Sequence, residues 1–202
     1  MRLVLASASP RRAELLRAAG FTFDILAVDL DERVRDGESP EAYVERLARD
    51  KAGAAMQRFE ERAQRSCGRE RAVMDDLVVL GADTAVVVDG TILGKPRDDG
   101  DAAAMLAALS GRRHDVLTGV CLRSASVERG HVETTGVYMS KLSNEDIAWY
   151  VGSGEGRDKA GGYAVQGLAS RFVTGIEGSY SNVVGLPIAT VAALLRELAS
   201  IG

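Results

Sequence analysis

Asp83 places a carboxylate inside the most apolar run of the chain. Residues 77–88 read Leu-Val-Val-Leu-Gly-Ala-Asp-Thr-Ala-Val-Val-Val, a pattern that predicts a buried strand. Burying a carboxylate costs several kcal/mol unless a cation or hydrogen-bond donors compensate it. Either a metal ion or a lysine therefore lies opposite Asp83, or Gly81 allows a bulge and Asp83 faces water at a strand end. Asp31 and Glu32 follow another expected strand, and they either join the same acidic cluster or form a solvated turn.

The segment Ser7-Ala8-Ser9-Pro10-Arg11-Arg12 could bind an anion. A strand over residues 2–7 is expected to lead into a helix that has Ser9 as its N-cap and Pro10 at its first position. Free backbone N–H groups at a helix N-terminus attract phosphate, and two arginines can grip its oxygens in a bidentate manner. The alternative is an ordinary capped surface helix. A Walker A loop is excluded, because GxxxxGK followed by Ser or Thr occurs nowhere in the chain.

A glycine-rich stretch over residues 158–167 is a third candidate for ligand contact. Its glycines would let the backbone approach a ligand closely, while Lys159 and Gln166 offer a positive charge and an amide. A flexible loop without a role is the alternative. Gly94-Lys95-Pro96 places a further cation at a turn, which is uninformative when taken alone.

Glycine, proline and capping signals divide the chain into alternating strands and helices, which predicts an α/β protein. Strands are expected over residues 2–7, 21–28, 77–88, 91–93, 114–123, 131–140 and 171–176, and helices over residues 10–19, 40–51, 101–109, 143–150 and from 187 onward. Asp89-Gly90 is a strong hairpin signal, so the sheet is expected to be mixed. Residues 57–76 are dense in Arg and Glu and predict a solvated helix end and loop. No repeat or linker is visible, so residues 1–202 are expected to form one domain.

The composition is that of a globular protein rather than a disordered one. Of 202 residues, 46% are hydrophobic and 27% are charged, enough to bury a substantial core. The net charge of −4 argues against a general nucleic-acid binder, although a local cluster of Lys and Arg could still hold a small anion. No apolar run approaches the roughly 20 residues that cross a bilayer. The polar residues that follow Ala6 at once favour a buried strand over a signal peptide.

The cysteines and histidines show no metal-site spacing. Cys67 and Cys121 form no CxxC pattern, and both are expected to be unpaired. His114 and His131 are expected to be structural or exposed. These features favour a cytoplasmic enzyme that contacts neither nucleic acid nor a membrane.

Read together, these segments closely resemble the Maf family of nucleoside triphosphate pyrophosphatases, also described as septum-formation inhibitors. The matching blocks follow the family's order over nearly the whole chain: Leu5-Ala6-Ser7-Ala8-Ser9-Pro10-Arg11-Arg12, Leu80-Gly81-Ala82-Asp83-Thr84, Gly94-Lys95-Pro96, Leu109-Ser110-Gly111-Arg112, Asp158-Lys159-Ala160-Gly161, and Gly178-Ser179-Tyr180 followed by Asn182-Val183-Val184-Gly185-Leu186-Pro187. Each block alone is a modest signal, whereas all of them in this order are highly specific.

The resemblance implies an α/β fold in which helices flank a mixed, twisted central sheet. It further implies an elongated molecule with two lobes and a deep cleft, commonly as a homodimer. By the same match Asp83 would be the catalytic residue and Glu32 a metal ligand, while Asp158 would help to order the site. The residues expected to face the triphosphate are Ser7, Arg12, Lys51, Lys95 and Lys159.

Three positions separate substrate preferences within the family. Here they are Arg11, Thr84 and Gln166, which resemble the branch that acts on dTTP and UTP rather than the branch that acts on 7-methyl-GTP. The chain departs from the family at Gly162-Tyr163-Ala164-Val165, where Ala, Tyr, Gly and Ile are more usual, and in a longer Arg-rich insertion over residues 64–76. The alanine in the first of these blocks removes backbone freedom near the expected base pocket, which bears on the substrate more than on the reaction type.

The implied reaction converts a nucleoside triphosphate into the monophosphate and pyrophosphate. It requires stabilisation of the charge on the phosphoryl oxygens and a water aligned opposite the leaving pyrophosphate. A divalent cation, Mg²⁺ or Mn²⁺, held by Asp83 and Glu32 would serve both needs, and it should carry much of the activation because a free carboxylate is a weak base. Thr84 and Gln166 would read the pyrimidine edge by hydrogen bonds.

Two other functions fit the same residues. A non-catalytic nucleotide sensor that inhibits septation through a protein partner would bind nucleotide without metal-stimulated release of pyrophosphate. A pyrophosphatase that clears modified nucleotides, such as 7-methyl-GTP, would differ only in its substrates. The acidic residues count against the sensor, since they would repel a triphosphate unless a cation intervenes.

Overall fold

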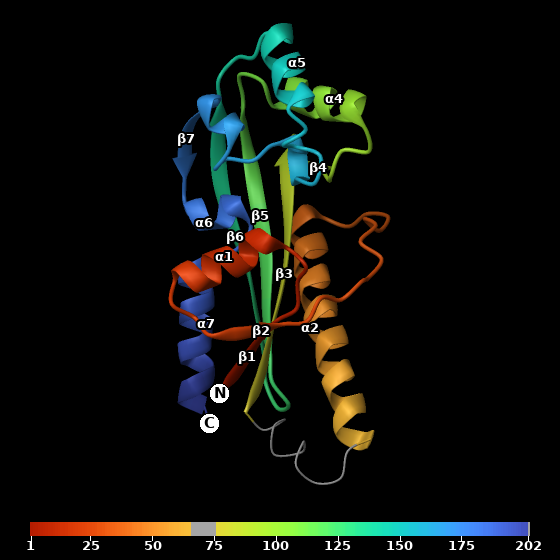
Figure 1. The fold of residues 1–202 in the computed structure, drawn as a ribbon, viewed down its shortest axis with the longest axis vertical. Helices are drawn as coiled ribbons and strands as arrows, with labels where there is room; N and C mark the ends of the chain where they lie inside the picture. The colour runs from red at the N-terminus through yellow and green to blue at the C-terminus, as the bar shows by residue number, and fades with distance from the viewer. Residues whose placement is uncertain (66–75, 202) are drawn as a thin grey trace. The chain divides into compact units, whose positions relative to one another are not determined.

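The computed structural model describes residues 1–65 and 76–201 and has the alternating elements of an α/β protein (Figure 1). Its strands are β1 (Arg2–Leu5), β2 (Phe23–Ile25), β3 (Leu77–Val88), β4 (Thr91–Leu93), β5 (Arg113–Arg123), β6 (Glu128–Met139) and β7 (Val173–Glu177). Its helices are α1 (Pro10–Ala18), α2 (Pro40–Arg65), α4 (Asp99–Leu109), α5 (Asn144–Gly152), α6 (Tyr180–Val184) and α7 (Ile188–Ile201), with 3₁₀ turns at Ala160–Gly162 and Leu168–Arg171.

The strands form one open, mixed sheet, as predicted. Their order is β2-β1-β3-β5-β6-β7, and β4 pairs with β3 outside this path. β1 runs parallel to both β2 and β3, whereas the β3–β4 and β6–β7 pairs are antiparallel. The β3–β4 hairpin turns at Asp89 and Gly90, which have φ values of 50° and 75°. Two successive positive φ values are what a tight primed turn requires, which is why this dipeptide was a reliable signal.

The described residues group into two compact units. The first unit comprises residues 1–83, 118–133 and 185–202, and the second comprises residues 84–117 and 134–184, apart from positions outside the described ranges. Each unit has apolar clusters of its own. The predictions of a single domain over 1–202 and of a deep cleft stay predictions.

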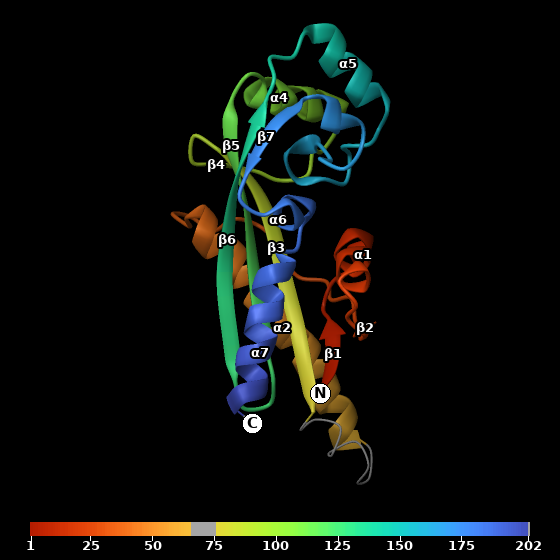
Figure 2. The same ribbon diagram turned by 90° about the vertical axis from the view of Figure 1, so that its left-hand side faces the viewer.

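In the first unit, alternate residues of β3 pack with different helices. Leu77 and Val79 belong to a cluster with α2, whereas Val78 and Leu80 belong to a cluster with α1 and α7. This division follows from the period of two along a strand. Helices α2 and α7 accordingly lie on opposite sides of the strands (Figure 1), with α7 in front of α2 in the turned view (Figure 2).

Two glycines allow α2 to lie directly against the sheet. A Cβ at Gly81 on β3 would lie 2.1 Å from the carbonyl oxygen of Ala48, and a Cβ at Gly119 on the neighbouring β5 would lie 2.2 Å from that of Val44. Real Cβ atoms do not approach backbone oxygens so closely, so side chains here would push the helix away. Gly81 therefore allows close packing of α2, a role that the sequence analysis did not assign to it.

The second unit packs α4 and α5 with the strands through a separate apolar cluster. Leu106 and Leu109 of α4 meet Tyr150 of α5 there. Buried Asn182 on α6 donates from Nδ2 to the carbonyl oxygen of Val116 and to Thr135 Oγ1, both at 3.0 Å. These bonds hold the short helix α6 to two strands.

Several elements differ from the expectations. Helix α2 extends to Arg65, into residues 57–76 that were expected to be a solvated helix end and loop, and β2 has three residues instead of the expected eight. Helix α6 was not predicted at all. The capping signal at the start of the helix expected over residues 143–150 is confirmed as a capping box, because Ser143 Oγ accepts from the N–H of Asp146, whose carboxylate accepts from the N–H of Ser143. The remainder of the Arg-rich insertion lies outside the described residues.

The minor expectations have mixed outcomes. Cys121 is a buried free thiol, as expected, while Cys67 lies outside the described residues. His114 is buried, and His131 is half-exposed with Nε2 3.6 Å from Glu133 Oε2, so both fit structural or exposed roles. Over residues 1–65 and 76–201, every helix is too short or too polar to span a bilayer.

Replacing Gly81 with alanine tests the close packing of α2. The added methyl group would meet the backbone of Ala48 and Ala52, so we expect a loss of about 3 kcal/mol in the free energy of unfolding. The measurement is the midpoint of urea unfolding. Gly152→Ala is the control, because a Cβ there meets no atom within 4 Å. A Gly81→Ala midpoint equal to that of the parent chain would contradict this packing.

Candidate active site

Lys51 links the two carboxylates that the sequence singled out. Its Nζ lies 2.6 Å from Asp83 Oδ1 and 2.6 Å from Glu32 Oε1. Asp83 and Lys51 are each only 7% exposed, whereas Glu32 is exposed. Asp83 therefore does not face water, and the ammonium group of a lysine compensates its burial. Of the two acidic residues expected to join Asp83, Glu32 does so around the Lys51 ammonium group, whereas Asp31 is exposed and pairs with Arg33.

The fold brings Lys51 to Asp83 by two simple periodicities. Asp83 follows Gly81 by two residues on β3, so its side chain points to the same face, where α2 packs. Lys51 follows Ala48 by three residues on α2, and residues three or four apart share one face of a helix. Because Gly81 lets the Ala48 turn approach the strand, Lys51 lies opposite the carboxylate at the next inward position.

Side chains of α2 also hold the loop that carries Glu32. Tyr43 Oη donates to the carbonyl oxygen of Glu32 at 3.0 Å, and Arg46 Nη2 donates to that of Arg33 at 3.1 Å. Arg46 Nε also donates to Glu38 Oε1 at 2.5 Å. Burial raises the pKa of Tyr43 to about 12, with the negative charges of Asp83 and Glu32 adding to the shift. The phenol therefore stays protonated and able to donate.

Arg12 is a buried connector within the first unit. Its Nε donates to the carbonyl oxygen of Gly185 at 2.8 Å, and its Nη1 donates to that of Ala82 at 2.8 Å and to Ser7 Oγ at 3.2 Å. Burial lowers the pKa of Arg12, while the charges of Asp83 and Glu32 act in the opposite direction. Arg12 thus fixes the backbone immediately before Asp83, and its expected phosphate contact stays a prediction.

The other predicted residues of this region occupy more varied positions. Ser7 is buried beside Arg12, while Arg11 is partly exposed on α1. Ser9 is the N-cap residue of α1, yet its side chain makes no capping hydrogen bond. Thr84 is half-buried and follows Asp83 on the opposite face of β3.

Asp83 and Glu32 suit a divalent cation that also binds a nucleotide. Among the described residues, no group of three or more His, Cys, Asp or Glu side chains is arranged to hold a metal ion. Mg²⁺, however, is usually bound by one or two carboxylates together with substrate phosphates. Two neighbouring carboxylates supply hard oxygen donors of the kind that Mg²⁺ and Mn²⁺ prefer. Lys51 Nζ occupies the point that both face, so a divalent cation would have to bind beside this ammonium group or displace it.

In the second unit, the glycine-rich stretch is an ordered loop. The N–H of Gly161 donates to the carbonyl oxygen of Gly94 at 3.0 Å, which joins this loop to the segment that carries Lys95. Lys159 Nζ pairs with the carboxylate of its neighbour Asp158. Two of the lysines expected at the phosphates therefore lie on segments bonded to each other. The expected ligand contact of this loop and the alternative of a loop without a role both stay predictions.

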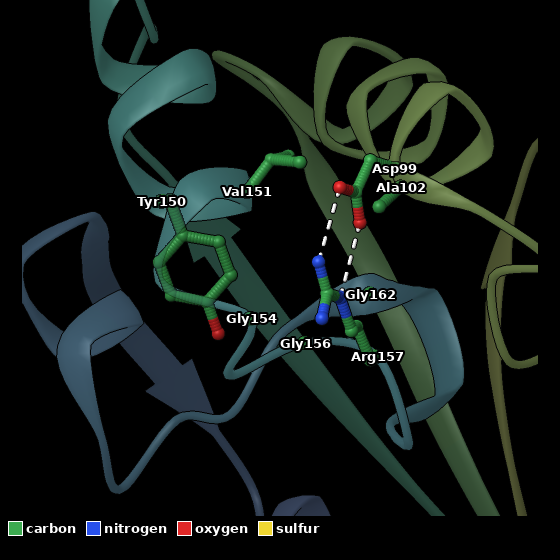
Figure 3. A pocket seen from close by; sticks show the side chains of 8 residues that line it. All are labelled: Asp99, Ala102, Tyr150, Val151, Gly154, Gly156, Arg157 and Gly162. Carbon is green, nitrogen blue, oxygen red and sulfur yellow. Dashed lines mark hydrogen bonds and ion pairs between the residues drawn. The ribbon is translucent and has the colours of Figure 1, made fainter.

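A small pocket lies under this loop (Figure 3). Arg157 crosses it to Asp99 on α4, with Nε–Oδ1 and Nη2–Oδ2 distances of 3.1 Å. Tyr150 and Gly156 form part of its wall. A Cβ at Gly156 would lie 2.0 Å from the carbonyl oxygen of Gly162, so two stretches of the loop are in direct backbone contact. The ion pair and this contact fix the residues on either side of Asp158.

The sequence analysis assigned no role in the site to Tyr43 and Arg46. The available signal was their placement on α2, three residues apart and upstream of Lys51 on the same helix. The structure also resolves the departure at Ala164. Among the described residues other than glycine, only Asp89 has a positive φ, so Ala164 occupies a conformation that an alanine adopts freely.

Comparison with known proteins gives a consistent result. The family model described as Maf-like protein matches residues 2–198. A dTTP/UTP pyrophosphatase of Anaeromyxobacter dehalogenans (strain 2CP-C) is 52% identical, covering 96% of this chain and 93% of the relative. Proteins of the same name from Koribacter versatilis (strain Ellin345) and Hahella chejuensis (strain KCTC 2396) are each 48% identical, covering 97% of this chain and 94% and 92% of the relatives.

Replacing Lys51 with methionine tests whether its ammonium group compensates Asp83. The change leaves a carboxylate buried without its cation, so we expect a loss of about 3–5 kcal/mol in the free energy of unfolding. The double variant Lys51→Met with Asp83→Asn should recover most of the lost free energy of unfolding, because the buried carboxylate is then absent. Arg33→Met is the control, since it removes an exposed pair with Asp31 and should leave the urea midpoint nearly unchanged. Equal midpoints for Lys51→Met and the parent chain would contradict this account.

Proposed function

The chain belongs to the Maf family, and on that basis we propose that it hydrolyses dTTP and UTP to the monophosphate and pyrophosphate. The observation that carries the proposal is the buried Asp83 carboxylate, held with Glu32 around Lys51 Nζ. An ion pair with a purely structural role would need only the Asp83 carboxylate. The second carboxylate, that of Glu32 on a loop, makes the site suited to a further cation. The names of the relatives, at about half identity over most of the chain, support the same reaction.

The chemistry follows from what must happen at the α-phosphorus. Water attacks this atom while the bond to the bridging oxygen breaks, and pyrophosphate leaves on the opposite side. We assign Asp83 to orienting this water and accepting its proton, and Lys51 to holding Asp83 in place and neutralising phosphate charge. Preorganised charges in a partly dry site need little rearrangement as charge develops, which is where their stabilising effect arises.

A divalent cation would be held by Asp83 and Glu32. When bound, it would supply charge neutralisation on the phosphates and make an attached water more acidic. Arg12 would act mainly through the backbone of Ala82, and Ser7 would lie beside it, next to the bound phosphates. Tyr43 would fix the loop of Glu32, because it binds that residue's carbonyl oxygen.

The remaining substrate contacts are proposed from the family resemblance. Lys95 and Lys159 would neutralise phosphate oxygens, with Asp158 holding Lys159 in position. Arg11, Thr84 and Gln166 are assigned to the choice of base, since hydrogen bonds to a base edge reject wrong bases by leaving polar groups unpaired. A homodimer in the cytoplasm completes the proposal.

Two rival functions differ from this one in what they release. A nucleotide sensor would bind dTTP without releasing pyrophosphate. A pyrophosphatase for modified nucleotides would release pyrophosphate fastest from a substrate such as 7-methyl-GTP. The proximity of Lys51 to both carboxylates supports catalysis over sensing, because simple binding of an anion gains nothing from two acidic groups.

A pyrophosphate-release assay tests the function directly. Incubation with dTTP and Mg²⁺ should give dTMP and pyrophosphate, resolved by ³¹P NMR, and EDTA should abolish the reaction. UTP should react comparably, and both should exceed GTP, dCTP and 7-methyl-GTP in kcat/KM. Release of orthophosphate would mean that another bond is cut, and activity unchanged by EDTA would remove the metal from the mechanism.

A further inference from the structure

Gln166 lies in a segment without regular secondary structure, within a turn in which the N–H of Gly167 donates to the carbonyl oxygen of Ala164 at 3.1 Å. Side chains from outside this turn bind the backbone around it. The segment joins the 3₁₀ turns at Ala160–Gly162 and Leu168–Arg171. Tyr163, Ala164 and Val165 are buried, whereas Gln166 is exposed. Gln166 is therefore a surface residue that directly follows three buried residues.

Tyr150 holds the backbone before Gln166. The N–H of Ala164 donates to Tyr150 Oη at 3.0 Å, and the same hydroxyl donates to Glu155 Oε2 at 2.8 Å. Tyr150 is 1% exposed. Burial raises the pKa of this phenol, and the bond to the Glu155 carboxylate raises it further. The hydroxyl thus keeps the proton that it donates to Glu155.

Glu155 holds the backbone after Gln166. Its second carboxylate oxygen, Oε1, accepts from the N–H of Leu168 at 3.0 Å. A Cβ at Gly167 would lie 2.0 Å from this oxygen, so the contact requires glycine at that position. One connected pair of side chains therefore binds the amides two residues before and two residues after Gln166.

His114 provides a separate support at the start of the segment. Its Nε2 lies 2.7 Å from Tyr163 Oη, and the two rings meet edge to face with centroids 5.4 Å apart. Burial lowers the pKa of His114 to about 4, so the ring is neutral near pH 7. With this contact the segment is supported at three points by residues outside it.

We propose that Tyr150 and Glu155 are positioning residues that fix Gln166 and thereby set the preference among nucleotide bases. The inference rests on the proposed function, in which Gln166 reads the base. An amide discriminates between bases only while its donor and acceptor keep a fixed orientation, since a mobile amide can rotate to serve a different edge. The two bonds to the backbone on either side of Gln166 fix the position and direction from which its side chain starts, which narrows the orientations that the amide can take toward a base.

Single-atom changes can separate positioning from general stability. Tyr150→Phe removes one hydroxyl and keeps the ring, which packs against Phe172 and Trp149. Glu155→Ala removes the other half of the pair. Tyr138→Phe is the matched control in the same unit, because it also deletes a hydroxyl that donates to a glutamate, Glu177, at 3.1 Å.

The readout is the ratio of kcat/KM for dTTP to that for dCTP, together with the ratio of the association constant for dTTP to that for dCTP, both measured in EDTA. We expect Tyr150→Phe and Glu155→Ala each to lower both ratios by about tenfold, chiefly through KM and binding of dTTP. Tyr138→Phe should leave both ratios unchanged. In a Gln166→Ala background, adding Tyr150→Phe should lower neither ratio further, because the positioned group is already absent.

Other outcomes overturn the inference. The first is that Tyr150→Phe and Glu155→Ala lower kcat/KM equally for dTTP and dCTP. The second is that adding Tyr150→Phe to Gln166→Ala lowers the preference for dTTP by the full factor again. The third is that the parent chain binds dTTP and dCTP equally. A chain that prefers dTTP in binding but releases no pyrophosphate would refute the proposed function alone. The binding ratios would then still decide whether Tyr150 and Glu155 position Gln166. If Tyr150→Phe does not fold, Glu155→Ala decides the question.

Discussion

The contact between Lys51 and Asp83 is the interaction on which the rest of the site depends. A carboxylate 7% exposed in the middle of a buried strand is tolerable only with a cation against it, and the ammonium group at 2.6 Å provides that cation. The same ammonium group draws in Glu32 from a loop. One lysine therefore brings together two carboxylates that are far apart in the sequence.

Residues close to Lys51 and Asp83 hold the elements that bring the two side chains together. Gly81 and Gly119 admit the backbone of α2 to the face of the sheet, and Tyr43 and Arg46 on that helix hold the loop of Glu32. In the second unit, a different device gives comparable order to a stretch that lacks regular structure. There the glycines allow backbone segments to lie in contact, and the side chains of Tyr150 and Glu155 accept hydrogen bonds from the backbone N–H groups of Ala164 and Leu168. Both devices fix functional groups through short contacts rather than through long regular elements.

The sequence predicted the local features of this protein better than the long-range ones. The hairpin at Asp89 and Gly90 and the capping box at Ser143 were predictable because neighbouring residues alone decide them. The need of Asp83 for a partner was also predictable from its burial, but the choice between a metal ion and a lysine was not. That choice depends on α2 lying against β3, a contact between residues 32 positions apart.

The features that were missed share the same physical origin. Tyr150 reads in the sequence as part of an apolar helix face, and its ring indeed packs in the core, yet its hydroxyl binds the backbone of a loop 14 residues away. Arg12 reads in the sequence as a phosphate ligand, and nothing in the sequence predicts that Gly185, 173 residues distant, accepts one of its hydrogen bonds. Residue type and periodicity assign a face to a side chain, whereas the partner on that face comes only from the tertiary fold.

A double-mutant cycle on the two carboxylates tests most directly whether they act together. The rates to compare are kcat/KM for pyrophosphate release from dTTP by the parent chain, Asp83→Asn, Glu32→Gln and the double variant. Asp83→Asn should reduce the rate by about 10²–10⁴-fold relative to the parent chain. The double variant should be no more than about threefold slower than Asp83→Asn alone, because the effects of substitutions in groups that act as one unit are not additive. Near-normal turnover of Asp83→Asn, or losses that multiply fully in the double variant, would contradict the account.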